Sequence, residues 1–114
     1  MSRSPVTTHI LDTSRGRPAA GVPVVLELLD AGSWRAVGQG TTDDDGRVGD
    51  LLGADAFCAG HWRIRFATGV YFAQHETQGF YPYVEIVFEV TNPDEHHHVP
   101  LLLNPFGYST YRGS

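Results

Sequence analysis

The stretch His61-Trp62-Arg63-Ile64-Arg65-Phe66 alternates between large apolar and polar side chains. Successive side chains of a β-strand point to opposite faces, so this pattern predicts a strand that buries its apolar face. The stretch Val84-Glu85-Ile86-Val87-Phe88-Glu89-Val90 has the same period. If the two strands are neighbours, their arginines and glutamates pair across the outer surface, at about a few tenths of a kcal/mol per pair.

Similar short β-branched and aromatic runs recur along the chain, and 13 glycines and 7 prolines lie scattered between them. Short strands at regular turn spacing predict an all-β antiparallel sandwich. The predicted strands are Val6–Leu11, Val22–Leu29, Ala36–Thr42, Trp62–Ala67, Tyr83–Val90, His96–Leu103 and Gly107–Arg112, with a brief further strand after Gly46. One short helix, of about two turns, is expected over Phe72–Gln78.

Length and charge narrow the class of protein. The 114 residues suffice for one domain, residues 1–114, with a core of its own. A formal net charge of −5 argues against nucleic acid or an anionic membrane as partner. No apolar run reaches the roughly 18 residues of a membrane span, and no targeting segment is evident. We therefore expect a soluble, cytoplasmic protein.

The reactive side chains are limited in kind. All eight basic residues are arginine, which excludes Schiff-base chemistry by lysine and leaves planar cations suited to carbonyl and carboxylate groups. Cys58 is the only cysteine, so an intrachain disulfide and thiolate metal clusters are excluded. We expect Cys58 to be a buried packing residue rather than a nucleophile.

Histidine is abundant, with six in the chain. Alternation in the first predicted strand places His9 on one face with Thr7 and Leu11. In the strand that begins at His96, the core face consists of His97, Val99, Leu101 and Leu103. His98 and Leu102 then lie on the outer face. Leucines beside histidines on an outer face are typical of a surface that another subunit covers. The remaining two, His61 and His75, are expected to be solvated.

Two groups of residues could form a metal site, but each has a simpler interpretation. His96 and His98, two residues apart, could join His9 in a three-histidine zinc site, but no carboxylate that would orient the ligands is evident. The turn Asp43-Asp44-Asp45-Gly46 lacks the ligand spacing of a calcium loop, so a type I turn is expected. We predict no metal. Arg47, which follows this turn, either pairs with the aspartates or serves a functional site.

The run Tyr111-Arg112-Gly113-Ser114 concentrates an aromatic ring, a guanidinium, a flexible glycine and a carboxylate directly after a strand-like stretch. Chain ends are usually frayed polar tails, so this composition predicts an ordered segment with a function. The sequence contains no glycine-rich phosphate loop, nucleophile elbow or HExxH helix, and a nucleophilic serine is not expected.

Taken together, these residues resemble the 5-hydroxyisourate hydrolases, the transthyretin-related enzymes of purine catabolism. The resemblance covers essentially the whole chain in order. The stretches that carry it are Thr7–Asp12, Gly21–Val24, Thr41–Arg47, Phe80–Pro82 and His98–Ser114. The terminal Tyr-Arg-Gly-Ser is its most specific part, because it separates the enzyme from transthyretin, the hormone carrier of the same fold.

The resemblance implies a transthyretin-like (prealbumin-like) antiparallel β-sandwich of two four-stranded sheets, with one short helix between the fifth and sixth strands. It implies a homotetramer, a dimer of dimers, with active sites in a channel between protomers. The implied reaction is hydrolytic ring opening of 5-hydroxyisourate to 2-oxo-4-hydroxy-4-carboxy-5-ureidoimidazoline, without a cofactor.

The resemblance also assigns roles to residues. The catalytic residues are His9, Arg47 and His98. The substrate-binding residues are Tyr111, Arg112, Gly113 and Ser114. His98 is the preferred general base, with His9 as its partner in proton delivery and Arg47 on the carbonyl oxygens of the substrate. His97 replaces an expected tyrosine, but its position alternates away from the channel, so we expect catalysis to survive.

Two other functions fit the same fold. One is a non-catalytic, transthyretin-like module that binds an aromatic small molecule in the channel. The other is a structural sandwich that mediates oligomerisation. His9, Arg47 and His98 argue against both, because neither function needs two imidazoles and a guanidinium around a small pocket.

Overall fold

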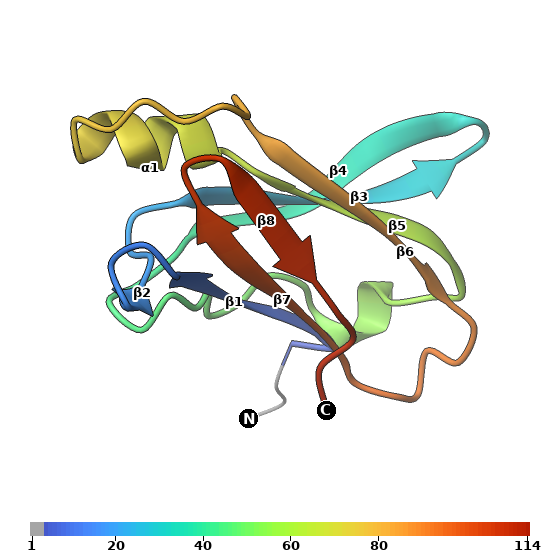
Figure 1. Ribbon diagram of the computed structural model, residues 1–114. Coiled ribbons are helices and arrows are strands. Elements are labelled where there is room, and N and C mark those ends of the chain that lie inside the picture. Colours follow the sequence, from blue (N-terminus) through green and yellow to red (C-terminus); the bar gives the residue numbers. More distant parts are fainter. Residues whose placement is uncertain (1–3) are drawn as a thin grey trace.

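Two four-stranded sheets pack face to face in the computed structural model, which describes residues 4–114 (Figure 1). The first sheet has the order β2-β1-β7-β8. Its strands are β1 (Val6–Asp12), β2 (Arg17–Pro18), β7 (His97–Asn104) and β8 (Gly107–Thr110). The second sheet has the order β4-β3-β5-β6. Its strands are β3 (Pro23–Asp30), β4 (Ser33–Thr41), β5 (Gly60–Phe66) and β6 (Val84–Val90).

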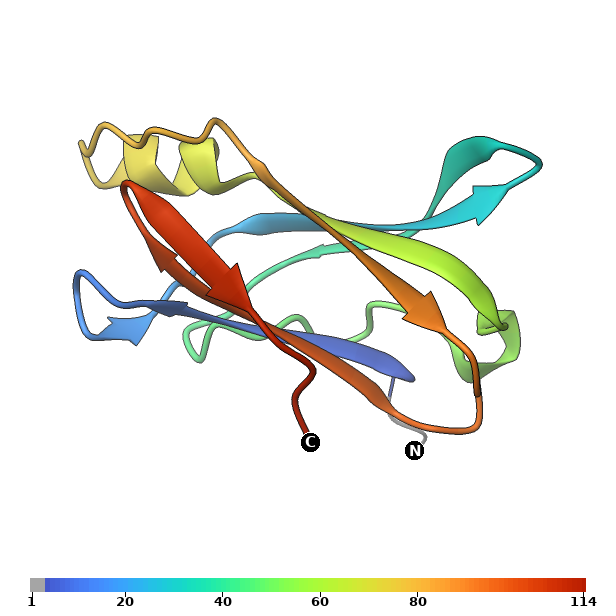
Figure 2. The same cartoon turned by 45° about the vertical axis from the view of Figure 1, so that its right-hand side comes forward.

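The predicted sandwich is confirmed, and each predicted strand is present within a few residues of its expected ends. Only the two-residue β2 was not predicted, because two residues are too few to show an alternating pattern. The β3–β4 hairpin projects beyond the body of the sandwich (Figure 2). A 3₁₀ turn, η1 (Ala54–Ala56), lies between the second hairpin strand and β5.

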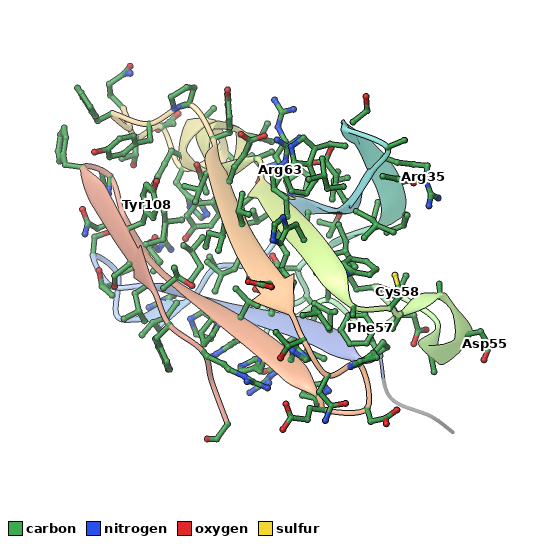
Figure 3. The ribbon with its side chains drawn as sticks, turned by 90° about the vertical axis from the view of Figure 1, so that its right-hand side faces the viewer. Arg35, Asp55, Phe57, Cys58, Arg63 and Tyr108 are labelled. Carbon is green, nitrogen blue, oxygen red and sulfur yellow. The ribbon has the colours of Figure 1, made fainter. Side chains whose placement is uncertain are left out.

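The alternation in β5 is confirmed, because Trp62, Ile64 and Phe66 are all fully buried. On the outer face of the same strand, Arg63 forms ion pairs with Glu27 on β3, at 2.9 Å, and with Glu85 on β6, at 3.6 Å. Its position on the sheet surface is visible in Figure 3. The predicted arginine–glutamate pairing between β5 and β6 is therefore confirmed, and β3 adds a second partner.

One strand pair departs from the antiparallel pattern. β1 and β7 run parallel, with Thr7 opposite His98 and His9 opposite Pro100. Parallel neighbours cannot be joined by a tight hairpin, and nearly the whole chain lies between these two strands. No local turn signal marks such a pair, so alternation alone did not predict it.

The helix α1 (Thr68–Gln74) begins four residues before the predicted Phe72–Gln78. Two aromatic residues determine its position, because Tyr71 and Phe72 are both buried. At its start, the amide of Gly69 donates to the carbonyl of Pro82 at 3.0 Å. Within residues 4–114, no helix has the length and apolar character of a membrane span.

The expectation that Cys58 is buried is wrong. Its side chain is exposed, directly after η1 (Figure 3). Its neighbour Phe57 faces the core instead and contacts the rings of Trp62 and His97, with centroids 5.2 and 5.4 Å apart. In this short segment the sequence does not show which of the two adjacent side chains, Phe57 or Cys58, packs into the core.

A buried carboxylate connects β1 to the helix α1. Asp12 at the end of β1 is 1% exposed, and its Oδ2 accepts a hydrogen bond of 2.7 Å from the hydroxyl of Tyr71 on α1. Burial opposes ionisation of Asp12, but hydrogen bonds from Ser14, Tyr71 and Arg15 outweigh it and lower its pKa.

Replacing Tyr71 by phenylalanine removes one donor to this carboxylate. We expect Tyr71→Phe to lower the free energy of unfolding at pH 7 by about 1.5–3 kcal/mol, the usual contribution of a hydrogen bond to a charged group. Because the pKa of Asp12 is lowered by folding, its stabilisation is present above the unfolded value of about 3.9 and is lost as the pH falls through the folded value. That loss should begin at higher pH in the variant.

Urea unfolding curves between pH 7 and about pH 3 measure both effects. The matched control is Tyr83→Phe, since Tyr83 is 44% exposed and lies directly before β6 in the other sheet. Equal stabilities of the two variants at every pH would contradict the assignment.

Candidate active site

The outer face of the β1–β7 pair brings two histidines together. Thr7 lies opposite His98 and His9 lies opposite Pro100, so the two imidazoles are diagonal neighbours on one face. Both are half-buried, as are Leu11 and Leu102 on the same face. The predicted placement of His9 and His98 on the outer surface is confirmed, although the leucines are less exposed than expected.

Arg47 joins this face from the loop that follows β4. Its backbone forms an isolated antiparallel bridge with His9. The preceding Gly46 has φ +76° and makes the approach possible, because a Cβ there would lie 2.5 Å from the carbonyl oxygen of Ile10. The amide of Ile10 donates to the carbonyl of Gly46 at 2.9 Å, which fixes the loop against β1. The brief extended segment predicted after Gly46 thus corresponds to this bridge.

The acidic turn before Arg47 binds its backbone. Oδ1 of Asp43 accepts hydrogen bonds from the amides of Asp45, at 2.9 Å, and Arg47, at 3.0 Å. This arrangement agrees with the simple turn that was predicted. Within the described part of the chain, no ion pair joins the Arg47 guanidinium to a carboxylate. Its charge is therefore not cancelled by the turn.

The surroundings of His98 favour its neutral form. Burial lowers the pKa of its imidazole. Repulsion from Arg47, and from His96 and His9 when they are protonated, lowers it further, while a backbone hydrogen bond with Thr7 acts in the opposite direction. A neutral imidazole near pH 7 is able to accept a proton. The same charges show that these four side chains belong to one electrostatic cluster.

The segment after β8 returns to this cluster. β8 pairs with β7 as far as Thr110, opposite Leu101, and stops there because Pro100 has no amide to donate. The pairing resumes at Gly113, whose amide donates to the carbonyl of His98 at 2.9 Å in the same register. This register sets Tyr111 opposite Pro100, and Tyr111 remains 58% exposed. The predicted strand therefore ends at Thr110, but the segment beyond it is ordered.

The backbone of Gly113 lies close to the His98 ring. A Cβ at position 113 would lie 2.5 Å from Cδ2 and 3.2 Å from Cγ of His98, and 3.3 Å from Cγ of Pro100. Only glycine lets the backbone lie this close to the imidazole. Ser114 follows directly and is exposed.

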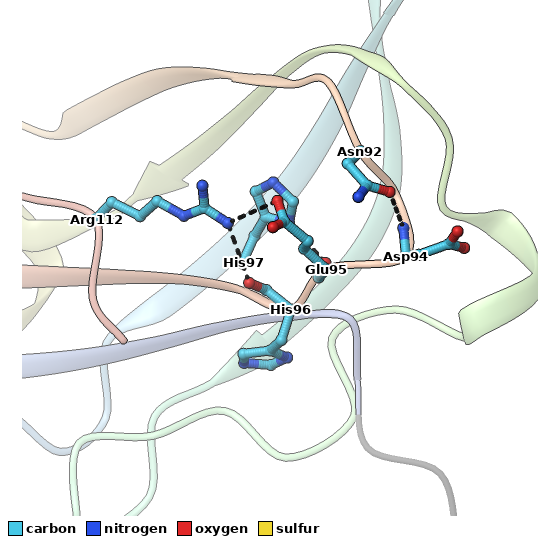
Figure 4. Close-up of polar contacts among 6 residues, drawn as sticks. All are labelled: Asn92, Asp94, Glu95, His96, His97 and Arg112. Carbon is cyan, nitrogen blue, oxygen red and sulfur yellow. Dashed lines mark hydrogen bonds and ion pairs between the residues drawn. The ribbon is translucent and has the colours of Figure 1, made fainter.

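Arg112 contacts the residues that precede β7. One of its guanidinium nitrogens lies 3.5 Å from the Glu95 carboxylate and 3.5 Å from the His96 carbonyl oxygen (Figure 4). Both contacts tie the terminal segment to the start of β7. They support a role for Arg112 in holding its neighbours.

A cavity of about 340 Å³ lies between β6, β7 and the segment after β8. Ile86, His97 and Val99 are buried residues of its lining. The predicted site residues His98, Tyr111 and Arg112 also line it. His97 is 5% exposed, and its Nδ1 bonds the Glu95 carbonyl at 2.9 Å. The prediction that position 97 faces away from His9 and His98 is confirmed.

Sequence reasoning missed two contacts of Thr7. The Thr7 hydroxyl lies 2.8 Å from Nδ1 of His98 and 2.8 Å from Nε2 of His96. Alternation had placed Thr7 on the face of His9, but only the parallel register sets it opposite His98. Nowhere in residues 4–114 do three His, Cys, Asp or Glu side chains gather as metal ligands.

Comparison with known proteins identifies relatives of the whole chain. A model of the HIUase/Transthyretin family matches residues 6–113. The chain is 50% identical over 127 residues to the uric acid degradation bifunctional protein TTL of Arabidopsis thaliana, a match that covers 99% of this chain and 38% of that protein. It is 42% identical over 113 residues to 5-hydroxyisourate hydrolase of Mus musculus, covering 97% of this chain and 96% of that enzyme.

Two solved structures share the fold. Sea bream transthyretin in complex with thyroxine has a TM-score of 0.91 and 32% identity, over 96% of this chain and 94% of the other. The 5-hydroxyisourate hydrolase of Klebsiella pneumoniae has a TM-score of 0.83 and 34% identity, over 96% and 98% of the two chains.

Removing the Arg47 charge should restore the basicity of His98. We expect Arg47→Ala to raise the pKa of His98 towards its ordinary value of about 6.5, because one of the charges that oppose protonation is lost. A titration followed by NMR of the imidazole measures the shift. Arg65→Ala, which removes a guanidinium stacked on Tyr83 in the other sheet, should leave it unchanged. An unaltered His98 pKa in Arg47→Ala would separate Arg47 from the cluster.

The approach of Gly113 to the imidazole predicts a second effect. In Gly113→Ala, the added methyl collides with His98, at an overpacking cost of about 1–3 kcal/mol. Exchange of the residue 113 amide should therefore accelerate about tenfold or more, as measured by NMR hydrogen exchange. Gly53→Ala is the control, because nothing lies within 4 Å of its added Cβ. Unchanged exchange would mean that the segment does not rest on the ring.

Proposed function

The chain belongs to the HIUase/transthyretin family, and we propose that it hydrolyses 5-hydroxyisourate, opening the ring to 2-oxo-4-hydroxy-4-carboxy-5-ureidoimidazoline. The chain is then an enzyme, a hydrolase that acts on a cyclic amide. One observation supports this activity above all: His98 lies in a cluster with His9 and Arg47 on one outer face.

Hydrolysis of a cyclic amide needs a base for water, stabilisation of the carbonyl oxygen and a proton for the leaving nitrogen. His98 is the general base, supported by its lowered pKa and its half-buried position. It takes a proton from water while the oxygen bonds to the carbonyl carbon. His9 orients the water or delivers the proton to the nitrogen as the carbon–nitrogen bond breaks.

Arg47 stabilises the charge that develops on the carbonyl oxygen. Its guanidinium is exposed on the same face as the imidazoles and has no carboxylate partner within the described part of the chain. A planar cation of this kind donates hydrogen bonds to two oxygens at once. Its charge also keeps His98 neutral, so one residue serves both the substrate and the base.

The terminal segment forms one wall of the site. Tyr111, Gly113 and Ser114 are the proposed substrate contacts, supported by the return of the segment to His98. For Arg112, the ion pair with Glu95 supports an indirect part, in which it holds the wall in place. The reaction uses no cofactor.

The active unit is a homotetramer, a dimer of dimers, with the site in a channel between protomers. Large apolar residues that remain exposed support the assembly. They include Phe80, Tyr83, Val87, Phe106 and Tyr108, at 69, 44, 60, 72 and 42% exposure. The cytoplasmic location stays a prediction from composition.

A carrier of aromatic ligands remains the alternative function, because the fold is shared with a transthyretin that was crystallised with thyroxine. Decay of the ultraviolet absorbance of freshly prepared 5-hydroxyisourate distinguishes the two. The hydrolase accelerates this decay catalytically, whereas a carrier does not turn the substrate over.

Loss of either imidazole should abolish most of this activity. General acid–base catalysis contributes about 10²–10⁴-fold, so His9→Ala and His98→Ala should each lower kcat at least about a hundredfold in the decay assay. His61→Ala is the matched control, because His61 is exposed on β5 of the other sheet. Folding of all three variants is checked by thermal melts. Turnover like that of the wild type in both site variants would remove the histidines from the mechanism.

A further inference from the structure

The hydroxyl of Thr7 lies between two imidazoles, 2.8 Å from Nε2 of His96 and 2.8 Å from Nδ1 of His98. We propose that this bridge fixes the tautomer of His98, with the proton on Nδ1 and the lone pair on Nε2. The inference rests on the proposed function, in which His98 is the base. Thr7 and His96 are then positioning residues that act through His98.

The single proton of the Thr7 hydroxyl limits the tautomers that the two rings can adopt. A threonine hydroxyl carries one proton to donate, and its oxygen accepts. The oxygen can accept two hydrogen bonds, but within residues 4–114 the Thr7 hydroxyl has no partner other than these two rings. Its proton is used within the bridge when one ring nitrogen accepts it and the other ring donates to the oxygen. His96 and His98 cannot both accept this single proton, so their tautomers are coupled.

Two arrangements satisfy this requirement. In the first, His96 donates to Thr7 and Thr7 donates to Nδ1 of His98, which leaves the proton of His98 on Nε2 and no free basic nitrogen. In the second, Nδ1 of His98 donates to Thr7 and Thr7 donates to Nε2 of His96. Only the second leaves Nε2 of His98 able to take a proton, and it persists unchanged when His98 becomes an imidazolium.

The second arrangement therefore matches both states of a general base. Nε2 takes a proton from water as the water oxygen bonds to the carbonyl carbon. That proton then passes to the leaving nitrogen, directly or through His9, as the carbon–nitrogen bond breaks. The proton on Nδ1 does not move. A partner that holds an imidazole in one tautomer is a recurring device in acyl transfer. A backbone hydrogen bond with Thr7 also favours protonation of His98, as a carbonyl that accepts from Nδ1 would.

The bridge makes the base sensitive to the charge of His96. A protonated His96 must donate from Nε2, which frees the Thr7 proton to turn towards Nδ1 of His98 and favours the opposite tautomer. The other charges around His98 are Arg47 from the loop and His9 from β1, and Arg112 with its partner Glu95 lies beside His96. Two protonations, of His98 and of His96, should therefore inactivate the base, so activity falls more steeply with acid than one titration allows.

The first experiment reads the tautomer directly. Nitrogen-15 NMR of histidine-labelled, substrate-free wild type above pH 8 should show His98 protonated on Nδ1. Thr7→Val removes the hydroxyl but keeps the branched shape, and should convert His98 to a mixture of tautomers. Thr7→Ser should retain the wild-type spectrum. A wild-type His98 protonated on Nε2, or one that Thr7→Val leaves unchanged, overturns the proposal.

The second experiment measures kcat and KM for 5-hydroxyisourate across pH. Thr7→Val should lower kcat about tenfold, a part of the 10²–10⁴-fold that a general base contributes, with little change in KM. Thr7→Ser should recover most of that loss. His96→Gln keeps an oxygen that accepts from Thr7 but removes a titrating group. On the acidic side of the pH–kcat profile, kcat of this variant should therefore fall as expected for a single protonation. An acid limb equally steep in His96→Gln and wild type overturns the coupling.

Thr8→Val provides the matched control. Thr8 is the neighbouring residue, and its hydroxyl also bonds β7, at 2.6 Å to the Val99 carbonyl, but on the core face. This variant should lose stability, but its His98 tautomer and the acidic side of its pH–kcat profile should remain those of the wild type. A change in either would mean that loss of any hydroxyl bond between β1 and β7 has this effect. That result would overturn the proposal. An inactive wild type would instead reject the proposed function, and the substrate-free spectra would still decide between the two arrangements.

Discussion

The parallel pairing of β1 with β7 is the contact on which the rest of the site depends. Its register sets Thr7 beside His98 and brings His9 onto the same face. Two further backbone bridges attach to this pair, one from Arg47 to His9 and one from Gly113 to His98. Backbone hydrogen bonds thus position every proposed catalytic group, so the side chains need little reorganisation before chemistry.

Alternation of side chains predicted much of this from sequence. It identified the buried faces of β5 and β7, and it separated His97 in the core from His98 on the surface. These inferences succeed because a strand with one buried face leaves its period of two in the sequence. Periodicity cannot assign the terminal Tyr-Arg-Gly-Ser to a site, and this prediction came from the family resemblance. In the structure, Gly113 lies against the His98 ring.

Alternation of side chains does not predict contacts between segments that are distant in the sequence. The Thr7–His98 hydrogen bond joins residues 91 positions apart and depends on a register that no local pattern encodes. The position of α1 depends on Tyr71, whose hydroxyl reaches Asp12 59 positions earlier. Cys58 was misplaced for a related reason, because the core selected its neighbour Phe57. In each case tertiary packing overrode the local signal.

The same long-range pairing has a consequence for how the protein acquires activity. Contacts between residues close to opposite ends of a chain incur the largest loop-closure entropy, and topologies rich in them fold slowly. The proposed base, its hydroxyl partner and the guanidinium come together only after β1 and β7 have met. A collapsed intermediate that contains only the β3–β6 sheet would hold much of the core and none of the assembled chemistry, so turnover would report completion of folding rather than compaction.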